Sequence, residues 1–439
     1  MRLRLVMITG VCLPMIFGQA FSSEFGEVDT QILIDKKSRL EEQFRKIQNE
    51  ISSLEHELNT RPAISETSMK SVIVPEYVKM IGTGESGFNH SNPSWTNDGT
   101  LLGFERHDER NKEIVIVDKD GNTIQTVKYI NDENDDLGLE LLLPEFAENV
   151  SYNAGLSWSP DNSKFVYMSN GSEGNYDLYL GNVGDTTSAR LTKHNEKDGH
   201  AHWSPANNSI AFISGRNGSA NIYLLDVTTN GLKPISNDNL AYLYPQWSPN
   251  GNQLAVIYGT NQNHDINIYS DILKGKPQKR TLISWTQDDL RPIWSPNGKK
   301  LAFYTNYNEE NDPNKWSIAV VDKDSDERST AEQIVPLIVA RDVVPDIDKG
   351  PAWMPDSQHI VYVKNNRKKY NPIELTNIQT KQIQSIKTET NINHDINISA
   401  NGVIAFRSQV DQWDHIFVAK IPTLTQSSNI TTHQDSHEK

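Results

Sequence analysis

Cysteine is almost absent from this sequence of 439 residues, because the single cysteine is Cys12, close to the amino terminus. A mature chain that began after this residue could form no disulfide, so its fold would depend on a large buried core. Long apolar runs are missing as well. No internal stretch approaches the roughly 20 residues that a membrane-spanning helix requires. The composition therefore predicts a large domain held together by its core.

Positive charge is also scarce. The chain has 42 lysines and arginines against 57 aspartates and glutamates, which gives a formal net charge of −15. Proteins that bind nucleic acid present a basic face, so we expect no nucleic-acid partner. The acidic balance is compatible with cationic ligands or divalent ions, and equally with simple solubility.

The first 20 residues have the pattern of a signal peptide. Arg2 and Arg4 form a basic start, Leu5–Phe17 is apolar, and Gly18–Ala20 resembles a small-residue cleavage site. This predicts a periplasmic or secreted protein with no membrane span after the signal is removed. Two other interpretations stay open, namely an uncleaved membrane anchor and a lipid attached to Cys12.

Glycine and proline are absent from Glu27–Asn59, which is rich in Glu, Lys, Gln and Arg. Apolar residues recur there at spacings of three and four, as in a coiled-coil seam: Leu40, Phe44, Ile47, Ile51, Leu54 and Leu58. We expect a helical arm over residues 27–60, ended by Pro62. A helix of this length needs a partner for its apolar stripe. Self-association and packing against the rest of the chain are both open.

One short phrase recurs seven times in the remaining sequence. It consists of an anchor residue, a tight polar turn and an apolar run, and the anchors are Trp95, Trp158, Trp203, Trp247, Trp294, Trp353 and Ile398. Four of the six intervals between anchors are 44 to 47 residues long. This period is typical of the four-stranded blades of a β-propeller. The pattern predicts an all-β, seven-bladed propeller, or six blades if the copy at Ile398 is miscounted.

Each repeat predicts its own strands. The turn Trp294–Gly298 contains Pro, Asn and Gly, the residues that tight turns prefer, and β-rich runs such as Leu301–Asn306 and Trp316–Asp322 follow it. Only the last repeat lacks a polar outer strand. We expect Ser71–Met80, which precedes the first repeat, to complete the last blade and close the ring. The propeller would then span residues 71–422 and be followed by a disordered tail over 423–439.

The segments Trp294–Phe303 and Leu191–Trp203 resemble the repeat of TolB-type propellers, and the resemblance covers about residues 71 to 422. It implies an exported, non-enzymatic propeller that recognises a protein or peptide partner in the cell envelope. The chain departs from TolB in its predicted helical arm and in its seven blades. The same repeat occurs in peptidase propellers and in some lyases. A serine peptidase is not expected, because the sequence contains no Gly-x-Ser-x-Gly elbow.

Two sets of residues lead into the anchors and are candidates for a site. Five positions before each anchor stand His90, Asn153, Asp198, Tyr242, Asp289, Asp348 and Asn393. Three positions before stand Asn92, Gly155, His200, Tyr244, Arg291, Gly350 and Asp395. Strand alternation would place both sets on one face, as a double ring at the channel mouth. Its carboxylates could hold a divalent cation or a basic peptide end, and a hydrated rim is the simpler interpretation.

Two histidines allow an enzymatic alternative. His200 and His202 are two apart on a predicted strand, where both could ligate one metal ion. A metal-dependent lyase acting on acidic oligosaccharides would need a third ligand, for which the candidates are His264, His394 and His415. Passive carbohydrate binding is a further alternative, with the aromatic candidates Tyr242, Tyr244 and Trp285.

Overall fold

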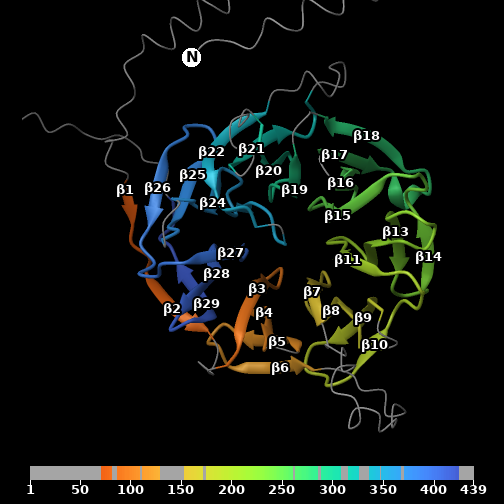
Figure 1. Ribbon diagram of the computed structural model, residues 1–439, viewed down its shortest axis with the longest axis horizontal. Helices are drawn as coiled ribbons and strands as arrows, with labels where there is room; N and C mark the ends of the chain where they lie inside the picture. Colours follow the sequence, from red (N-terminus) through yellow and green to blue (C-terminus); the bar gives the residue numbers. More distant parts are fainter. Residues whose placement is uncertain are drawn as a thin grey trace, which may run out of the picture. The chain divides into compact units, whose positions relative to one another are not determined.

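A computed structural model describes residues 71–81, 87–108, 111–128, 153–171, 175–260, 263–284, 288–307, 315–325, 336–346, 348–366 and 370–424. These residues form seven β-sheets arranged around a central axis, so the prediction of a seven-bladed propeller is confirmed (Figure 1). The expected signal peptide, the helical arm over residues 27–60 and almost all of the expected tail lie outside the described residues. Within the described part the one helix is η2 (Ile272–Lys274), a single 3₁₀ turn.

Each blade begins with the strand nearest the axis and continues outward through antiparallel neighbours (Figure 1). The first blade consists of β3 (Asn89–Trp95), β4 (Leu101–His107), β5 (Lys112–Asp118) and β6 (Thr123–Val127). The second consists of β7 (Asn153–Trp158), β8 (Lys164–Ser169), β9 (Asp177–Asn182) and β10 (Ser188–Arg190). The third consists of β11 (Asp198–Trp203), β12 (Ser209–Ser214), β13 (Asn221–Asp226) and β14 (Gly231–Pro234). The fourth consists of β15 (Ala241–Trp247), β16 (Gln253–Thr260), β17 (Asn263–Ser270) and β18 (Gln278–Ile283). The fifth is β19 (Asp289–Trp294), β20 (Lys300–Thr305), β21 (Trp316–Asp322), β22 (Leu337–Val343).

The last two blades receive strands from the start of the propeller. Blade six is β23 (Ala352–Trp353), β24 (His359–Val363), β25 (Ile373–Asn377), β26 (Ile383–Ile386) and β1 (Ser71–Ile73), and blade seven is β27 (Asn393–Ile398), β28 (Val403–Val410), β29 (Trp413–Lys420) and β2 (Tyr77–Ile81). β2 pairs antiparallel with β29, so the predicted closure is confirmed. The expected single strand Ser71–Met80 is wrong, because β1 pairs parallel with β26 instead. Pro75 lies between the two strands and has no N–H to donate to a ladder.

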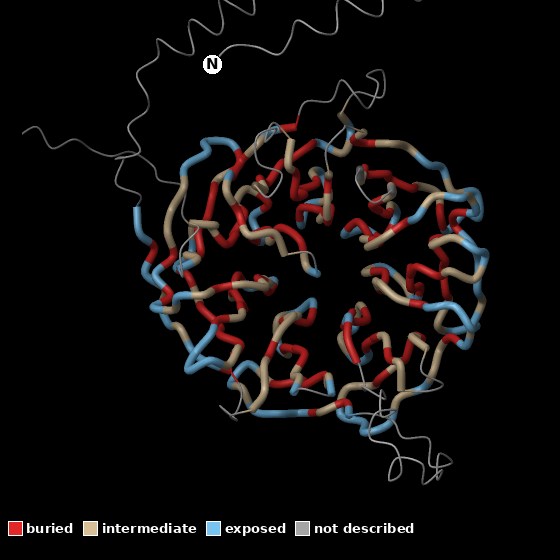
Figure 2. Tube along the Cα trace, in the orientation of Figure 1, coloured by how far each residue is buried: buried red, intermediate tan, exposed pale blue. Residues whose placement is uncertain are grey.

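The recurring tryptophans bind neighbouring blades together. The described core consists of seven apolar clusters, one at each junction between blades, and buried residues fill these junctions (Figure 2). Trp294 packs in one cluster, and its indole Nε1 donates to the Gln246 carbonyl of the preceding blade at 3.1 Å. Trp158 and Trp353 make the same bond to their preceding blades, each at 3.1 Å. Four anchors, Trp158, Trp247, Trp294 and Trp353, therefore contribute both apolar burial and an inter-blade hydrogen bond.

The polar turn after each anchor is stabilised by its own side chains. In blade five the Ser295 hydroxyl donates to Asn297 Oδ1 at 2.8 Å, and the Lys300 N–H donates to Ser295 Oγ at 3.0 Å. Gly298 has a φ of 69°, a left-handed conformation that glycine adopts without steric cost. The repeat can be recognised in the sequence because these contacts are local.

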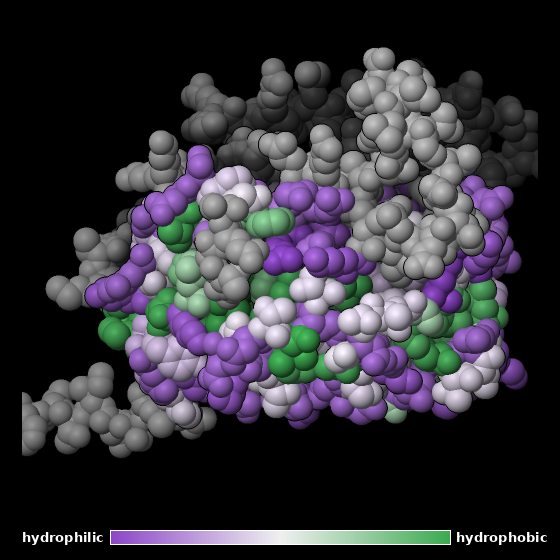
Figure 3. Space-filling view, turned by 90° about the horizontal axis from the view of Figure 1, so that it is seen from below, coloured by the Kyte–Doolittle hydropathy of each residue, from purple (hydrophilic) through white to green (hydrophobic). Residues whose placement is uncertain are grey.

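The outer wall seen from the side is largely hydrophilic, with separate apolar patches between the polar residues (Figure 3). The most exposed large apolar side chains are Val72 and Val74, at 59% and 63%, in and beside β1. Among the described residues, no helix has the length and apolarity needed to cross a membrane.

Candidate functional site

A β-bulge interrupts the innermost strand of six blades at the same position. In β11, for example, Gly199 pairs with Ile213 and His202 pairs with Ala211, so two residues of β11 oppose one residue of β12. The first residue of each bulge lies three positions before the anchor and has a positive φ, as does Gly350 in blade six. These residues, here called the bulge residues, are Asn92, Gly155, His200, Tyr244, Arg291, Gly350 and Asp395, with φ from 50° to 83°. A bulge adds a residue and reverses the alternation of the strand.

The predicted double ring is therefore wrong in its geometry. The bulge separates the two sets, and the residues five positions before the anchors lie inside the blades. Six of these residues are 4% exposed or less: His90, Asn153, Asp198, Tyr242, Asp289 and Asn393. Asp348 is the exception, because it lies in an exposed turn before the short strand β23.

The buried set makes structural contacts. The Arg216 guanidinium donates to both carboxylate oxygens of Asp198, at 3.0 and 2.8 Å. The Tyr242 hydroxyl donates to Asp238 Oδ2 at 2.8 Å, and Asn393 Nδ2 donates to the Asn371 carbonyl at 2.8 Å. The Asn153 amide donates to the Val127 carbonyl at 3.4 Å. These groups hold strand ends in place and are not available to a ligand in the channel.

Two further members of the set complete this picture. His90 Nδ1 lies 2.9 Å from the Asp414 carbonyl, and burial lowers the pKa of this histidine. Asp289 is fully buried, and burial raises its pKa well above 3.8. Among the described residues no group of three or more His, Cys, Asp or Glu side chains could hold a metal ion. The divalent cation considered from the sequence stays a prediction.

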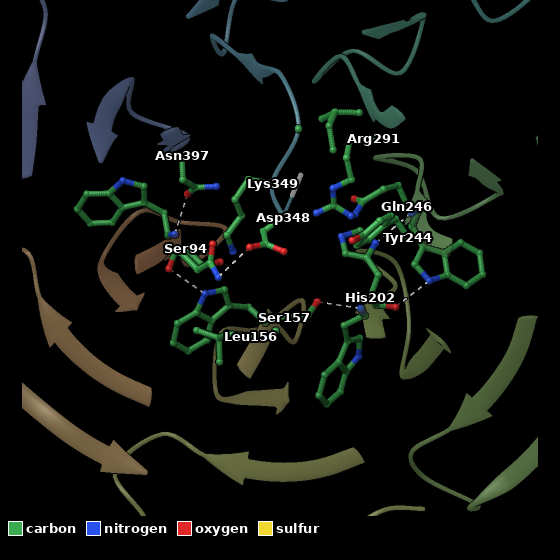
Figure 4. Close-up of a pocket in the computed structure, with 18 of the residues that line it drawn as sticks. Ser94, Leu156, Ser157, His202, Tyr244, Gln246, Arg291, Asp348, Lys349 and Asn397 are labelled. Atoms are coloured by element: carbon green, nitrogen blue, oxygen red, sulfur yellow. Dashed lines mark hydrogen bonds between the residues drawn. The ribbon is translucent and has the colours of Figure 1, made fainter. Parts of the chain in front are cut away.

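A cavity of about 580 Å³ lies inside the ring of bulges and is lined by residues of all seven blades (Figure 4). Seven of the predicted residues line it, namely Asp348 and the bulge residues Asn92, Gly155, His200, Tyr244, Arg291 and Gly350. The remaining bulge residue, Asp395, does not belong to the lining. The structure thus brings together six of the seven bulge residues and leaves the other set, except Asp348, outside the cavity.

One wall of the cavity is a row of three bulge residues from consecutive blades. The imidazole of His200 meets the ring of Tyr244 edge to face, with centroids 4.3 Å apart. The guanidinium carbon of Arg291 lies 4.0 Å from the centroid of the same ring. This distance suits a cation–π contact, which favours arginine over an aromatic face. Burial lowers the pKa of His200 to about 4, so this imidazole is neutral at pH 7.

Another part of the lining carries the carboxylates Glu105 and Asp348. Glu105 is 2% exposed and accepts hydrogen bonds from Lys112 Nζ at 2.8 Å, Asn92 Nδ2 at 3.0 Å and the Gly155 N–H at 3.1 Å. Asn92 Nδ2 also lies 3.4 Å from Asp348 Oδ2, which faces the same space. Charges of both signs meet in this part of the lining, because Lys112 binds Glu105 and Lys349 follows Asp348 in the chain.

One histidine of the pair already makes a contact within the fold. His202 Nδ1 accepts the backbone N–H of Trp247 at 3.0 Å, a contact that Ser157 and Asn397 make at the equivalent positions of other blades. Burial lowers the pKa of His202 to about 4, which keeps this imidazole neutral. The bulge breaks the alternation that was expected to align it with His200. The three candidate third ligands do not line the central cavity: His264, His394 and His415.

Sequence reasoning missed several residues of the cavity. Lys349 comes from the segment 344–350, which runs from β22 toward the axis (Figure 1). In the sequence, the sign that an extra segment lies here was the longer interval between the anchors Trp294 and Trp353. Glu105 and Lys112 lie on second and third strands and reach the cavity only through folding. Of the aromatic residues considered for carbohydrate, Tyr242 is fully buried.

Comparison with known proteins confirms the resemblance. Residues 145–336 match the family model of the TolB beta propeller domain. No curated protein matches the sequence. The family match covers less than half of this chain, and it indicates the type of repeat.

Three solved structures illustrate the range of similar propellers. An oligogalacturonate lyase from Vibrio parahaemolyticus is 12% identical and has a TM-score of 0.54, with 81% of this chain and 99% of that chain covered. A hydrazine synthase from Kuenenia stuttgartiensis is 12% identical and has a TM-score of 0.53, with coverage of 81% and 98%. TolB from Acinetobacter baumannii is 16% identical, with a TM-score of 0.43 and coverage of 68% and 79%. At such identities the likeness concerns the fold alone.

Proposed function

We propose that this protein, a TolB-like propeller, is a non-enzymatic binding protein that recognises a protein or peptide partner in the cell envelope. The observation that carries the proposal is the axial cavity of about 580 Å³, toward which seven blades direct charged and hydrogen-bonding side chains. This volume falls within the range of about 300–1,000 Å³ that is common for ligand sites. The end of a peptide fits such a space, and the rim around it remains for wider contacts.

The chemistry of the cavity supports binding more than catalysis. Glu105, the most buried carboxylate of the lining, is engaged by Lys112, by Asn92 and by a backbone N–H. His202 is held by the backbone of Trp247. Groups fixed in this way are poor proton carriers, because a general acid or base must be free to reach its substrate.

The place of action follows from the amino-terminal pattern. A signal peptide over the first 20 residues would export the chain, and partners would then be met in the periplasm or outside the cell. The helical arm over residues 27–60 would add a second contact, either with a second copy of the chain or with the propeller itself.

A photo-crosslinking experiment tests the proposal. A photoreactive phenylalanine replaces Gln246, which lines the cavity, and in a matched control replaces Leu232, which is 40% exposed on the outer strand β14. We expect an adduct with one envelope protein or peptide from position 246 and none from position 232. Equal adducts from both positions, or none from position 246, would contradict the proposal.

Metal analysis of the same purified protein tests the enzymatic alternative. Stoichiometric manganese or zinc that disappears in a His200→Ala variant, together with cleavage of an acidic oligosaccharide, would replace the binding function with a lyase activity. We expect neither, because His202 Nδ1 already accepts a backbone N–H and the described residues offer no third ligand.

A further inference from the structure

In the row His200, Tyr244 and Arg291, the last two residues have a backbone conformation that their types rarely adopt. The φ angles are 51°, 52° and 55°, in the left-handed region. Glycine, asparagine and aspartate tolerate this region far better, and these types occupy the other four bulges. Strain of this kind collects at ligand-binding sites, where the function of the side chain outweighs its cost. We therefore look for a ligand-binding role of the side chains in this row.

Arg291 enters the cavity without an ion-pair partner among the described residues, and the more distant carboxylates of Asp346 and Asp348 oppose the lowering of its pKa by burial. It is 6% exposed, its Nε has no hydrogen-bond partner, and no described carboxylate forms an ion pair with it. A buried cation is costly unless an anion compensates it. The stacked Tyr244 ring covers one face of the guanidinium and leaves its edge for a planar acceptor with two oxygens.

Lys349 supplies a second cation from another part of the fold (Figure 4). The N–H groups of Asp348 and Lys349 donate to Asp346 Oδ1 at 2.9 and 2.8 Å, which fixes the turn that carries them. The ammonium group makes no ion pair with the described residues. Two cations, one rigidly stacked and one on an anchored turn, therefore share one cavity.

The charge of the lining limits what the cavity can accept. Arg291, Lys349 and Lys112 are cationic, Glu105 and Asp348 are anionic, and the two histidines are neutral. The excess is one positive charge. A single carboxylate neutralises it, whereas a phosphate or a chain of acidic sugars would bring further negative charge toward Glu105 and Asp348.

We infer that Arg291 and Lys349 form a subsite for one carboxylate, and that the group it receives is the carboxyl terminus of a peptide. The backbone N–H groups of such a peptide can donate to the exposed carboxylate of Asp348, which lines the same cavity. This inference rests on the proposed binding function and adds the chemistry of the group that is bound. The ligand is therefore an anion, whereas the sequence predicted that the mouth could hold a cation or a basic peptide end.

Isothermal titration calorimetry of the full-length chain tests the subsite. The probes are N-acetyl-trialanine and its carboxyl-terminal amide, which differ only in the charged group. We expect the acid to bind at least tenfold more tightly than the amide, since a charge-assisted hydrogen bond contributes about this much. Arg291→Gln should weaken the acid about tenfold or more and Lys349→Gln severalfold, whereas Lys233→Gln on the exposed strand β14 should change nothing.

Several outcomes would overturn the inference. Equal binding of acid and amide, no binding of either, or undiminished binding by a folded Arg291→Gln variant would each remove the carboxylate subsite. Tighter binding of di-galacturonate or of inorganic phosphate would replace the peptide with another anion. Tighter binding of N-acetyl-Ala-Asp-Ala-amide would assign the carboxylate to a side chain. The comparison of acid and amide uses the unaltered protein, so a misfolded variant cannot obscure it.

Failure of this inference can be distinguished from failure of the proposed function. If position 246 crosslinks a partner while the acid and the amide bind equally, the binding function stands and the subsite is wrong. If the acid binds selectively while position 246 crosslinks nothing, the subsite stands and the envelope partner is wrong.

Discussion

Two bulky residues of this propeller, Tyr244 and Arg291, have left-handed backbone conformations that bulky side chains rarely adopt. A tyrosine or an arginine with φ near 50° is held in place by the ladder on both sides of the bulge, as the pairing of β15 with β16 on either side of Tyr244 shows. The local conformation is therefore imposed by the sheet and not chosen by the side chain. This allows the strain and the function of one position to be measured separately.

A pair of substitutions at His200 separates them. His200→Asn keeps a residue type that tolerates the left-handed region and loses an aromatic contact of about 0.5–1.5 kcal/mol, so the free energy of unfolding should fall by about 1 kcal/mol or less. His200→Val should lower it by more than 1 kcal/mol, because a β-branched residue tolerates φ near 50° poorly. Urea denaturation measures both variants. Equal stability of the two would show that the bulge places no constraint on residue type.

Asp346 makes stability depend on pH. Burial and the neighbouring Asp395 raise the pKa of this carboxyl to about 7, and its Oδ2 has no hydrogen-bond partner. A raised pKa means that the folded chain binds a proton that the unfolded chain releases above pH 4. Stability therefore falls as the pH rises from about 4 to about 7.

Asp346→Asn should remove this dependence. The variant should be more stable than the parent at pH 8, by at most a few kcal/mol, and similar to it at pH 4, because asparagine stays neutral throughout. Denaturation at the two pH values measures the difference. Asp342→Asn, which alters an aspartate that is 44% exposed, is the control and should keep the parent profile. An Asp346→Asn variant with an unchanged pH profile would show that the carboxyl is ionised in the fold.

At the scale of elements, the strands from the start of the propeller decide whether the ring is closed. β2 covers β29, which would otherwise present an open edge with unpaired backbone groups. β1 adds a parallel strand to the edge of the neighbouring blade. One continuous segment therefore joins blades six and seven on the outside of the ring.

Ile81→Ala tests this closure. Ile81 is 2% exposed at the end of β2 and packs in the cluster that contains Trp95 and Ile416. The substitution should lower the free energy of unfolding by about 2–5 kcal/mol. Met80→Ala, at a side chain that is 40% exposed, should change it by about 0.5 kcal/mol or less. Equal effects in equilibrium denaturation would mean that β2 contributes little to the ring.

At the scale of the whole molecule, the ring turns positions that are distant in sequence into neighbours. The backbone N–H of Trp95 donates to Asn397 Oδ1 at 2.9 Å, and Arg291 and Glu105 line the same cavity from blades five and one. The central cavity therefore depends on closure, because each blade supplies only a part of the lining. A propeller that lost its last junction would lose the site together with the ring.

The sequence by itself determined the repeat, the class of propeller, the seven blades and the closing strand. These features depend on contacts between residues close in the chain, such as Ser295 with Asn297, or on a period that can be counted. Only the tertiary structure decided which residues meet in the cavity. The bulge arises from pairing two residues against one across strands, and residue types such as His200 and Tyr244 give no sign of a positive φ. Lys349 joins them because a turn of blade six reaches the axis, a position that exists only once seven blades surround it.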